Sequence, residues 1–252
     1  MNPFISIDQR RMYNDLAWMW PIISPPEEYA EETKEYIRLI REHARIPVTS
    51  VVNLGCGGGH NDHTLKQSFT VTGIDISEGM LGLARELNPE NTYVGGDMRA
   101  VRLGQTFDAV TVFNSISYMR TIDGLKAAFQ TAFSHLRPGG VFVTGVEETL
   151  ESFQQNSTHC LACARNDVEI SLLENDYDPN PHDTHYEATF IYLIRRAGDL
   201  TIETDSHLLG LFPMKTWLEL LAQVGFEVRQ KVSAVPDQCG RVTPILVGVK
   251  PL

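Results

Sequence analysis

Apolar runs alternate with amphipathic stretches along the first part of the chain. Each run is short and rich in β-branched residues, as expected for strands that helices cover on both faces. The expected strands are residues 51–54, 69–74, 92–94, 107–113 and 141–146, and the expected helices are residues 62–67, 77–87 and 124–136. Ser77 is expected to cap the second of these helices, and residues 137–140 are expected to form a turn. The alternation predicts an α/β fold with a doubly wound, mostly parallel sheet that binds ligands at the carboxyl ends of its strands.

This alternation breaks near residue 147. Three extended segments without helices between them predict an antiparallel strand insert, and they are residues 168–173, 185–194 and 200–209. A helix at 213–222 and strands at 226–232 and 245–249 then complete a seven-stranded, Rossmann-like sheet. The connection between the last two strands is short for a parallel crossover, so we expect them to form an antiparallel hairpin.

The expected elements divide the chain into three parts. These are residues 1–47 (an N-terminal arm and helix), residues 48–147 and 211–252 (the ligand-binding domain), and residues 148–210 (the antiparallel insert). The arm is rich in aromatic residues, which either pack on the domain or form a lid over its ligand. The insert is expected to cap an acceptor or to make a dimer contact.

Candidate chemistry begins at a glycine loop between the first two expected strands. Gly55, Gly57 and Gly59 follow the first strand, and Asp75 ends the second, 75 − 55 = 20 residues after Gly55. Glycines allow a tight turn and the close approach of a ligand, and an acid at this distance suits the ribose hydroxyls of a nucleoside. A dinucleotide fingerprint would have its third glycine at the place of His60. The loop therefore predicts an adenosine-containing cofactor, with a spacing that departs from that of dinucleotide sites.

Composition narrows the range of partners. The 252-residue chain has a formal net charge of −11 and a pI of about 5.2, which disfavours broad contact with a nucleic-acid backbone and favours a small-molecule acceptor. No apolar run approaches membrane-spanning length, and the N-terminus lacks a basic segment followed by an apolar core. We therefore expect a cytoplasmic protein that binds neither nucleic acid nor membrane.

The four cysteines are too few for a disulfide scaffold in a chain of this length. Cys160 and Cys163 form a C-x-x-C pair near His159, His182 and His185, which is compatible with a zinc site. No second C-x-x-C pair accompanies them, and the spacing of the other ligands matches no structural zinc site. The sequence therefore favours a region without a metal.

Several segments together resemble the class I S-adenosylmethionine (SAM)-dependent methyltransferases along nearly the whole chain. They are residues 53–59 (Asn-Leu-Gly-Cys-Gly-Gly-Gly), 73–80, 96–98, 107–110, 136–140 and the closing hairpin. The extended insert, with residues 205–212 and 240–241, resembles the small-molecule branch that includes the dTDP-aminosugar N-methyltransferases. The resemblance implies methyl transfer from SAM to a small-molecule acceptor such as an aminosugar nitrogen.

The resemblance also implies which residues contact SAM. They are Tyr13, Gly55, Cys56, Gly57, Gly59, Asp75, Ile76, Met80, Asp97, Met98, Phe113, Asn114 and Ser115. Asp75 would accept hydrogen bonds from the ribose, Asp97 would accept one from the adenine, and Tyr13 would close over the carboxylate end. Relatives carry an acid where this chain has Asn53, so the ammonium group of SAM would lose an ion-pairing partner.

Methyl transfer from a sulfonium is an in-line displacement, which needs alignment of the acceptor and exclusion of water rather than a metal. An amine must be neutral when it attacks, so Tyr118 or Glu147 is a candidate base, although solvent could also take the proton. The candidate acceptor-binding residues are Trp20, Tyr118, Glu147 and Arg241, each of which could instead serve packing or lie in solvent.

Two other classes of function stay open at this point. A nicotinamide-dependent oxidoreductase would also use a glycine loop and a strand-end acid, but His60 counts against it. A SAM-binding scaffold without activity, whose insert mediates association, is kept open by Asn53. A homodimer is compatible with either the enzyme or the scaffold.

Overall fold

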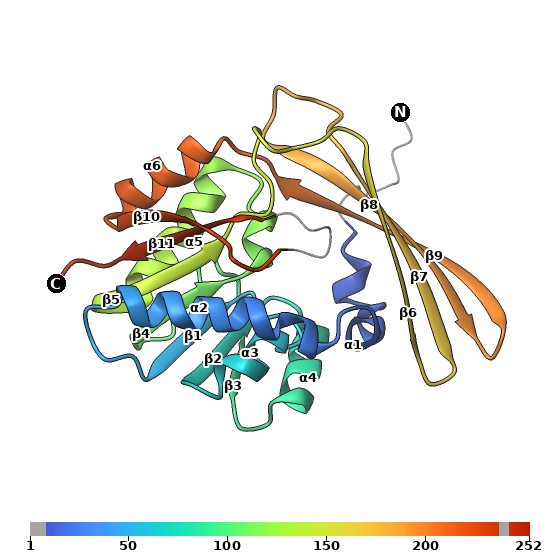
Figure 1. Cartoon of the computed structure of the whole chain (residues 1–252), viewed down its shortest axis with the longest axis horizontal. Coiled ribbons are helices and arrows are strands. Elements are labelled where there is room, and N and C mark those ends of the chain that lie inside the picture. Colours follow the sequence, from blue (N-terminus) through green and yellow to red (C-terminus); the bar gives the residue numbers. More distant parts are fainter. Residues whose placement is uncertain (1–8, 237–241) are drawn as a thin grey trace.

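The computed structural model describes residues 9–236 and 242–252, and within them eleven strands form two sheets (Figure 1). The larger sheet contains β1 (Ser50–Leu54), β2 (Thr70–Asp75), β3 (Thr92–Gly95), β4 (Phe107–Val112), β5 (Leu136–Gly145), β10 (Glu227–Val232) and β11 (Pro244–Val249). Its order is β10-β11-β5-β4-β1-β2-β3, and the only antiparallel pairings among its described residues are those of β11 with β10 and with β5. The predicted α/β class, the mostly parallel seven-stranded sheet and the closing hairpin are confirmed.

Helices cover both faces of this sheet (Figure 1). The α-helices are α1 (Trp20–Ile23), α2 (Ala30–His43), α3 (His60–Leu65), α4 (Glu78–Leu87), α5 (Ile122–His135) and α6 (Met214–Val224). Short 3-10 helices are η1 (Arg11–Tyr13), η2 (Ala17–Met19), η3 (Pro26–Tyr29) and η4 (Asn114–Tyr118). None of these helices is long and apolar enough to cross a bilayer, within the part of the chain that is described.

Alternate residues of the central strand face different helices, because successive side chains of a strand point to opposite faces. Val51 joins Tyr36 of α2 in one buried cluster. Its neighbour Val52 joins Phe129 of α5 and Trp217 of α6 in another. Both valines are fully buried, which explains why the strand sequence is apolar at successive positions.

The smaller sheet is the antiparallel insert, and it lies beside the larger sheet with the N-terminal arm between them (Figure 1). Its strands are β6 (Ser157–Arg165), β7 (Val168–Tyr177), β8 (His185–Arg196) and β9 (Asp199–Gly210). The last three were expected, but β6 was not, because its sequence Ser-Thr-His-Cys-Leu-Ala-Cys-Ala-Arg lacks the β-branched and aromatic enrichment of a strand. It forms because β7 supplies a ladder partner along its whole length.

Two local expectations need correction. Residues 137–140 are not a free turn, since β5 already begins at Leu136. The pairing register between β4 and β5 shifts between Phe107 and Ala109, so residues 137–140 of β5 bulge from the ladder. Within this bulge, Gly139 has a φ of 80°. Helix α3 begins at His60, two residues before the expected start. The expected cap of α4 is confirmed, because the Ser77 hydroxyl accepts the Met80 N–H.

Asp108 joins β1, β4 and β5 at the end of the sheet that lies opposite the glycine loop. Its Oδ2 accepts hydrogen bonds from the backbone and hydroxyl groups of both Thr49 and Ser50, at 2.9 to 3.0 Å. Its Oδ1 pairs with Arg137, which belongs to β5. Since the carboxylate is only 2% exposed, replacing it would leave several donors without a partner.

We expect Asp108→Ala to lower the free energy of unfolding by about 3 kcal/mol, because buried donors lose their acceptor. Urea unfolding followed by circular dichroism measures this loss. Asp167→Ala, at an exposed position of the β6–β7 turn, is the matched control and should stay within about 0.5 kcal/mol of the wild type. Equal midpoints for the two variants would contradict the anchoring role of Asp108.

Candidate active site

A cavity of about 740 Å³ lies where the glycine loop, the N-terminal arm and the insert meet. Its floor comes from the carboxyl ends of β1, β2 and β4, and one wall comes from side chains of β7, β8 and β9. It is lined by every residue predicted to contact the cofactor except Gly59, and also by Trp20, Tyr118 and Glu147. Residues far apart in the sequence are therefore brought to one site, as the strand-end rule predicts.

The glycine loop needs its glycines for two different reasons. Gly55, Gly57 and Gly59 all have positive φ values, of 73°, 54° and 75°, which other residues adopt only with strain. A Cβ on Gly55 would also lie 2.1 Å from the Ser115 hydroxyl, so its absence lets η4 approach the cavity floor. A Cβ on Gly59 would instead meet Asn88 at 2.7 Å, outside the cavity. Gly59 thus allows the close packing of α3 on α4 rather than lining the site.

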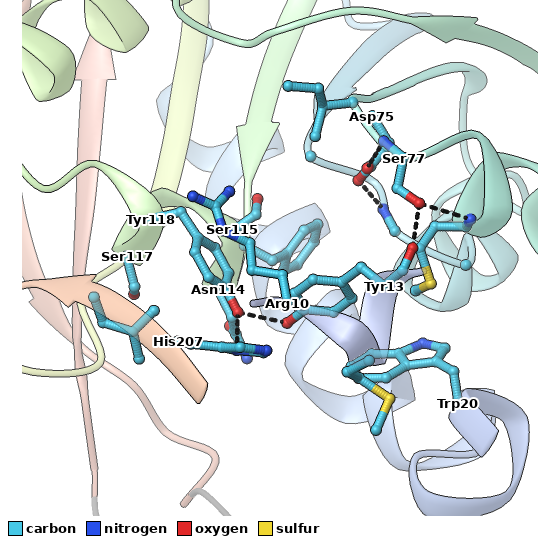
Figure 2. Close-up of a pocket in the computed structure, with 18 of the residues that line it drawn as sticks. Arg10, Tyr13, Trp20, Asp75, Ser77, Asn114, Ser115, Ser117, Tyr118 and His207 are labelled. Atoms are coloured by element: carbon cyan, nitrogen blue, oxygen red, sulfur yellow. Dashed lines mark hydrogen bonds between the residues drawn. The ribbon is translucent and has the colours of Figure 1, made fainter. Parts of the chain in front are cut away.

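Asp75 holds the loop from the end of β2 (Figure 2). Its Oδ2 accepts the Gly57 N–H and its Oδ1 accepts the Ser77 N–H, both at 2.8 Å. Burial raises the pKa of Asp75, and the hydrogen bonds from Ser77 and Gly57 oppose that rise. A carboxylate has about four acceptor lone pairs, so each oxygen can still accept a further hydrogen bond from a ligand in the cavity.

The neighbouring part of the cavity combines an apolar surface with a carboxylate. Met80 is buried, whereas Ile76 is 69% exposed and offers an apolar side chain that a flat ligand could cover. Asp97 also lines this part, but its carboxylate accepts hydrogen bonds from the Arg99 guanidinium at 3.0 Å, which lowers the pKa of Asp97. A ligand that donates to Asp97 would therefore share it with Arg99.

Residues of the N-terminal arm line the cavity beside the glycine loop. The Ser77 hydroxyl donates a hydrogen bond to the Tyr13 carbonyl, so the cap of α4 also holds the arm. Trp20 stacks on His60 with ring centroids 5.9 Å apart, and its edge meets Tyr13 at the same centroid distance. These contacts place aromatic surface beside the glycine loop, and the lid function of the arm stays a prediction.

The far end of the cavity carries an acid. Glu147 follows β5 and accepts a hydrogen bond from Ser117 at 3.1 Å. Its carboxyl faces the enclosed cavity, so burial raises its pKa to about 8, and the nearby Glu32 and Glu174 act in the same direction. Near neutral pH such a group holds a proton when the cavity is empty and releases it when a cation binds.

Asn53 lies where relatives carry an acid, and it was expected to offer the ammonium group of SAM no ion pair. It is 1% exposed and does not line the cavity. Its amide donates to Asp62 Oδ1 at 2.7 Å and accepts from the Thr111 hydroxyl at 3.2 Å. Burial raises the pKa of Asp62 to about 6, against the hydrogen bond from Asn53. The amide is therefore the partner of a second buried acid, which an acid at position 53 would repel.

The C-x-x-C pair lies on β6, where residues three apart point to opposite faces of the sheet. Cys160 is exposed and Cys163 half-buried, and neither lines the cavity. No group of three metal-binding side chains is present among the residues that the structure describes. Arg241, the remaining predicted acceptor contact, lies outside the described residues.

Sequence reasoning missed two residues of β9 that matter to the site. His207 lines the cavity, and its Nδ1 lies 2.7 Å from the Tyr118 hydroxyl. Asp205, 1% exposed, lies behind it with Oδ2 2.9 Å from His207 Nε2. The available signal was the spacing, because residues i and i+2 of a strand share one face.

Comparison with known proteins gives the class. Residues 51–140 match the family model described as a methyltransferase domain. This segment is therefore a methyltransferase domain, in a chain with the fold of class I SAM-dependent methyltransferases.

Particular relatives are aminosugar methyltransferases. The chain is 39% identical over 120 residues to dTDP-3-amino-3,4,6-trideoxy-alpha-D-glucopyranose N,N-dimethyltransferase of Streptomyces venezuelae. The aligned segment covers 46% of this chain and 50% of that protein. In three curated aminosugar relatives, the matched part spans about half of the relative's length (50%, 46% and 47%).

Solved structures extend the likeness to nearly the whole chain. Streptomyces venezuelae DesVI aligns with a TM-score of 0.80 at 25% identity, over 94% of this chain and 96% of that one. SAM-bound CalS10, an amino pentose methyltransferase from Micromonospora echinaspora, aligns with a TM-score of 0.76 at 24% identity, over 88% of this chain and 91% of that one. The second likeness supports the fold alone.

We expect Asp75→Ala to weaken SAM binding about 100-fold or more, because two hydrogen bonds to a charged acceptor contribute about 1.5–3 kcal/mol each. Isothermal titration calorimetry measures the affinity, and circular dichroism checks that the fold survives the loss of the Gly57 and Ser77 contacts. Glu78→Ala, three residues along and exposed, is the control and should bind SAM as the wild type does. An unchanged affinity for Asp75→Ala would contradict the ribose contact.

Proposed function

We propose that this protein is a SAM-dependent N-methyltransferase whose acceptor is the amine of a nucleotide-linked aminosugar. The observation that carries the proposal is the Glu147 carboxyl, enclosed at the far end of the cavity that the glycine loop opens into. A site for a neutral acceptor has no use for an acid in such surroundings, since desolvation of a charge is costly without a cationic partner.

The cofactor end fits SAM by the chemistry of its residues. Asp75 would hold the ribose, Ile76 and Met80 would cover the adenine, and Gly55 and Gly57 would allow the close approach of the remaining part. When bound, SAM supplies an electrophilic methyl group on a sulfonium. The chain's own part is to align the acceptor and to exclude water, which the arm and the insert do by enclosing the cavity.

The acceptor end combines an acid with apolar surface. Glu147 would bind the acceptor ammonium, with Ser117 fixing the carboxylate. Leu161, Leu172 and Phe190 contribute apolar side chains from the insert, which suit the ring face of a deoxygenated sugar. The named relatives act on dTDP-linked aminosugars, and this supports a nucleotide-linked acceptor here.

Arginines at the cavity are consistent with a diphosphate on the acceptor. Arg10 and Arg120 both line it, and a guanidinium suits bidentate binding of phosphate oxygens. The contact of Arg241 with the acceptor stays a prediction, as do the cytoplasmic location, the homodimer and the lack of binding to nucleic acid.

The proposal is tested by incubating the protein with SAM and a panel of dTDP-aminosugars that differ in the position of the amine. We expect formation of S-adenosylhomocysteine together with acceptor mass gains of one or two methyl groups. The matching dTDP-sugars with a hydroxyl in place of the amine are the controls and should not react. Turnover of the hydroxyl sugars, or SAM binding without any turnover, would contradict an amine acceptor.

We expect Glu147→Gln to raise the KM for the amine acceptor about tenfold or more while SAM affinity is retained, because the amide cannot pair with an ammonium. The same variant should unfold at a higher temperature than the wild type at pH 8 but not at pH 4. The folded-state pKa of about 8 exceeds the ordinary 4.5, so the wild type loses stability as pH rises between these values.

Glu148→Gln is the control for both measurements, since this neighbour lies outside the cavity lining. A wild-type KM in Glu147→Gln would show that Glu147 does not carry the acceptor charge, and an equal unfolding temperature at pH 8 would contradict the raised pKa of Glu147.

A further inference from the structure

A series of hydrogen-bonded side chains runs from the insert into the cavity, and Figure 2 shows its members His207, Tyr118 and Tyr13. Asp205 Oδ2 lies 2.9 Å from His207 Nε2, and His207 Nδ1 lies 2.7 Å from the Tyr118 hydroxyl. The Tyr118 and Tyr13 hydroxyls lie 2.8 Å apart. The chain thus joins β9, η4 and the N-terminal arm, and its inner members, Asp205 and His207, are 1% and 3% exposed.

The backbone brings these segments together closely. A Cβ on Gly210 would lie 2.2 Å from the Met119 carbonyl oxygen, so only glycine allows β9 to lie against the end of η4. This approach sets Tyr118 beside His207. The contact is therefore built into the fold, and any larger residue at position 210 would push the two side chains apart.

The protonation of the chain follows from its hydrogen bonds. Asp205 Oδ2 also accepts the Met12 N–H at 2.7 Å, and Oδ1 accepts the Ser206 N–H at 2.8 Å. Burial alone would raise the pKa of Asp205, but the hydrogen bonds from His207, Met12 and Arg11 hold it below its usual range. An ionised Asp205 requires the proton of His207 on Nε2, which leaves the Nδ1 lone pair for the Tyr118 hydroxyl.

We propose that His207, oriented by Asp205, accepts through Tyr118 the proton that the acceptor amine must lose. This inference rests on the proposed function. In the step, the ammonium N–H bond breaks and its proton goes to the Tyr118 oxygen, while the Tyr118 O–H bond breaks and that proton goes to His207 Nδ1. The products are a neutral amine, an unchanged Tyr118 and an imidazolium paired with Asp205.

Tyr118 needs a second group that can take its own proton. Burial raises the pKa of Tyr118 well above its ordinary value, so a free phenolate would not form by itself at neutral pH. With His207 taking the second proton, Tyr118 never carries a full charge. The Tyr118 hydroxyl donates to the Tyr13 hydroxyl in this structure. In the proposed step its O–H turns to His207 Nδ1, 2.7 Å away, and the lone pairs of its oxygen are left for the ammonium.

Glu147 and the hydrogen-bonded side chains of Asp205, His207 and Tyr118 have separate tasks in this arrangement. Glu147 binds the charged acceptor, and His207 receives its proton. The titratable and charged groups that surround His207 and Tyr118 come from several elements. They are Asp205 on β9, Tyr192 on β8, Tyr13 and Arg10 on the arm, and Glu147 after β5.

The test is the pH profile of kcat/KM for a dTDP-aminosugar that the wild type methylates. We expect His207→Gln and Tyr118→Phe to lose about 100-fold at pH 7 and to recover most of the activity above the pKa of the acceptor amine, where the amine is already neutral. Asp205→Asn should behave alike, because its amide keeps the geometry but turns the imidazole to the wrong tautomer.

Calorimetric SAM affinity and thermal unfolding are measured on the same variants. A loss of activity that is equal at every pH, or that follows a loss of SAM binding, would assign a merely structural role and overturn the proposal. So would a wild-type profile in His207→Gln, or a profile that shifts only in Glu147→Gln. His185→Gln is the matched control, since His185 at the start of β8 pairs with Asp183 outside the cavity and should keep the wild-type profile.

Failure of the proposed function looks different from failure of this inference. If the wild type methylates none of the amines, the proposed function is wrong. If it methylates one and the variants follow its pH profile, only the inference about His207 is wrong.

Discussion

Two adjacent residues of the N-terminal arm, Met12 and Tyr13, join the two sheets through hydrogen bonds. The Tyr13 carbonyl accepts from Ser77, whose own N–H is held by Asp75 at the end of β2. The Met12 N–H donates to Asp205 on the insert. Because both anchors are polar groups enclosed by protein, losing either leaves a buried group without a partner, and the position of the arm is narrowly fixed.

This double anchor makes the two ends of the cavity dependent on each other. The same Asp75 that would hold the ribose also holds Ser77, and the same Asp205 that orients His207 also holds the arm. A ligand that pulls Asp75 toward itself acts on a group that also holds Ser77 and, through it, the arm. The cofactor end and the acceptor end of the cavity are thus joined by a contiguous set of hydrogen bonds.

The sequence predicts the parts of the fold whose residues experience only local constraints. The strand that contains Val51 and Val52 could be predicted from the sequence, because burial on both faces requires apolar residues at successive positions. Strand β6 was not, because its pairing with β7 makes up for a weak intrinsic preference. The bulge at Gly139 likewise depends on the register of β4 and β5, which no local pattern contains.

The candidate site divides in the same way. The glycine loop and Asp75 could be found from spacing, since both lie in one strand–loop–helix–strand unit. Asn53 could not be assigned its partner Asp62, because the interaction depends on how α3 packs on the sheet. The contact of His207 with Tyr118 is still harder to predict from the sequence, because the two residues are 89 positions apart. They meet only because β9 approaches η4 closely at Gly210.

In the proposed reaction, positive charge would move toward the acids of the cavity. Methyl transfer from a sulfonium to an amine carries positive charge from sulfur to nitrogen. With the acceptor bound as proposed, Glu147, with Glu174 nearby, would lie on the acceptor side, so its attraction for the charge would grow as the transfer proceeds. An interaction that strengthens toward the transition state raises the rate, whereas one that is equal in both states only tightens binding. In the empty cavity the same acid lowers stability above its ordinary pKa, a cost that the fold bears at the site where the charge will arrive.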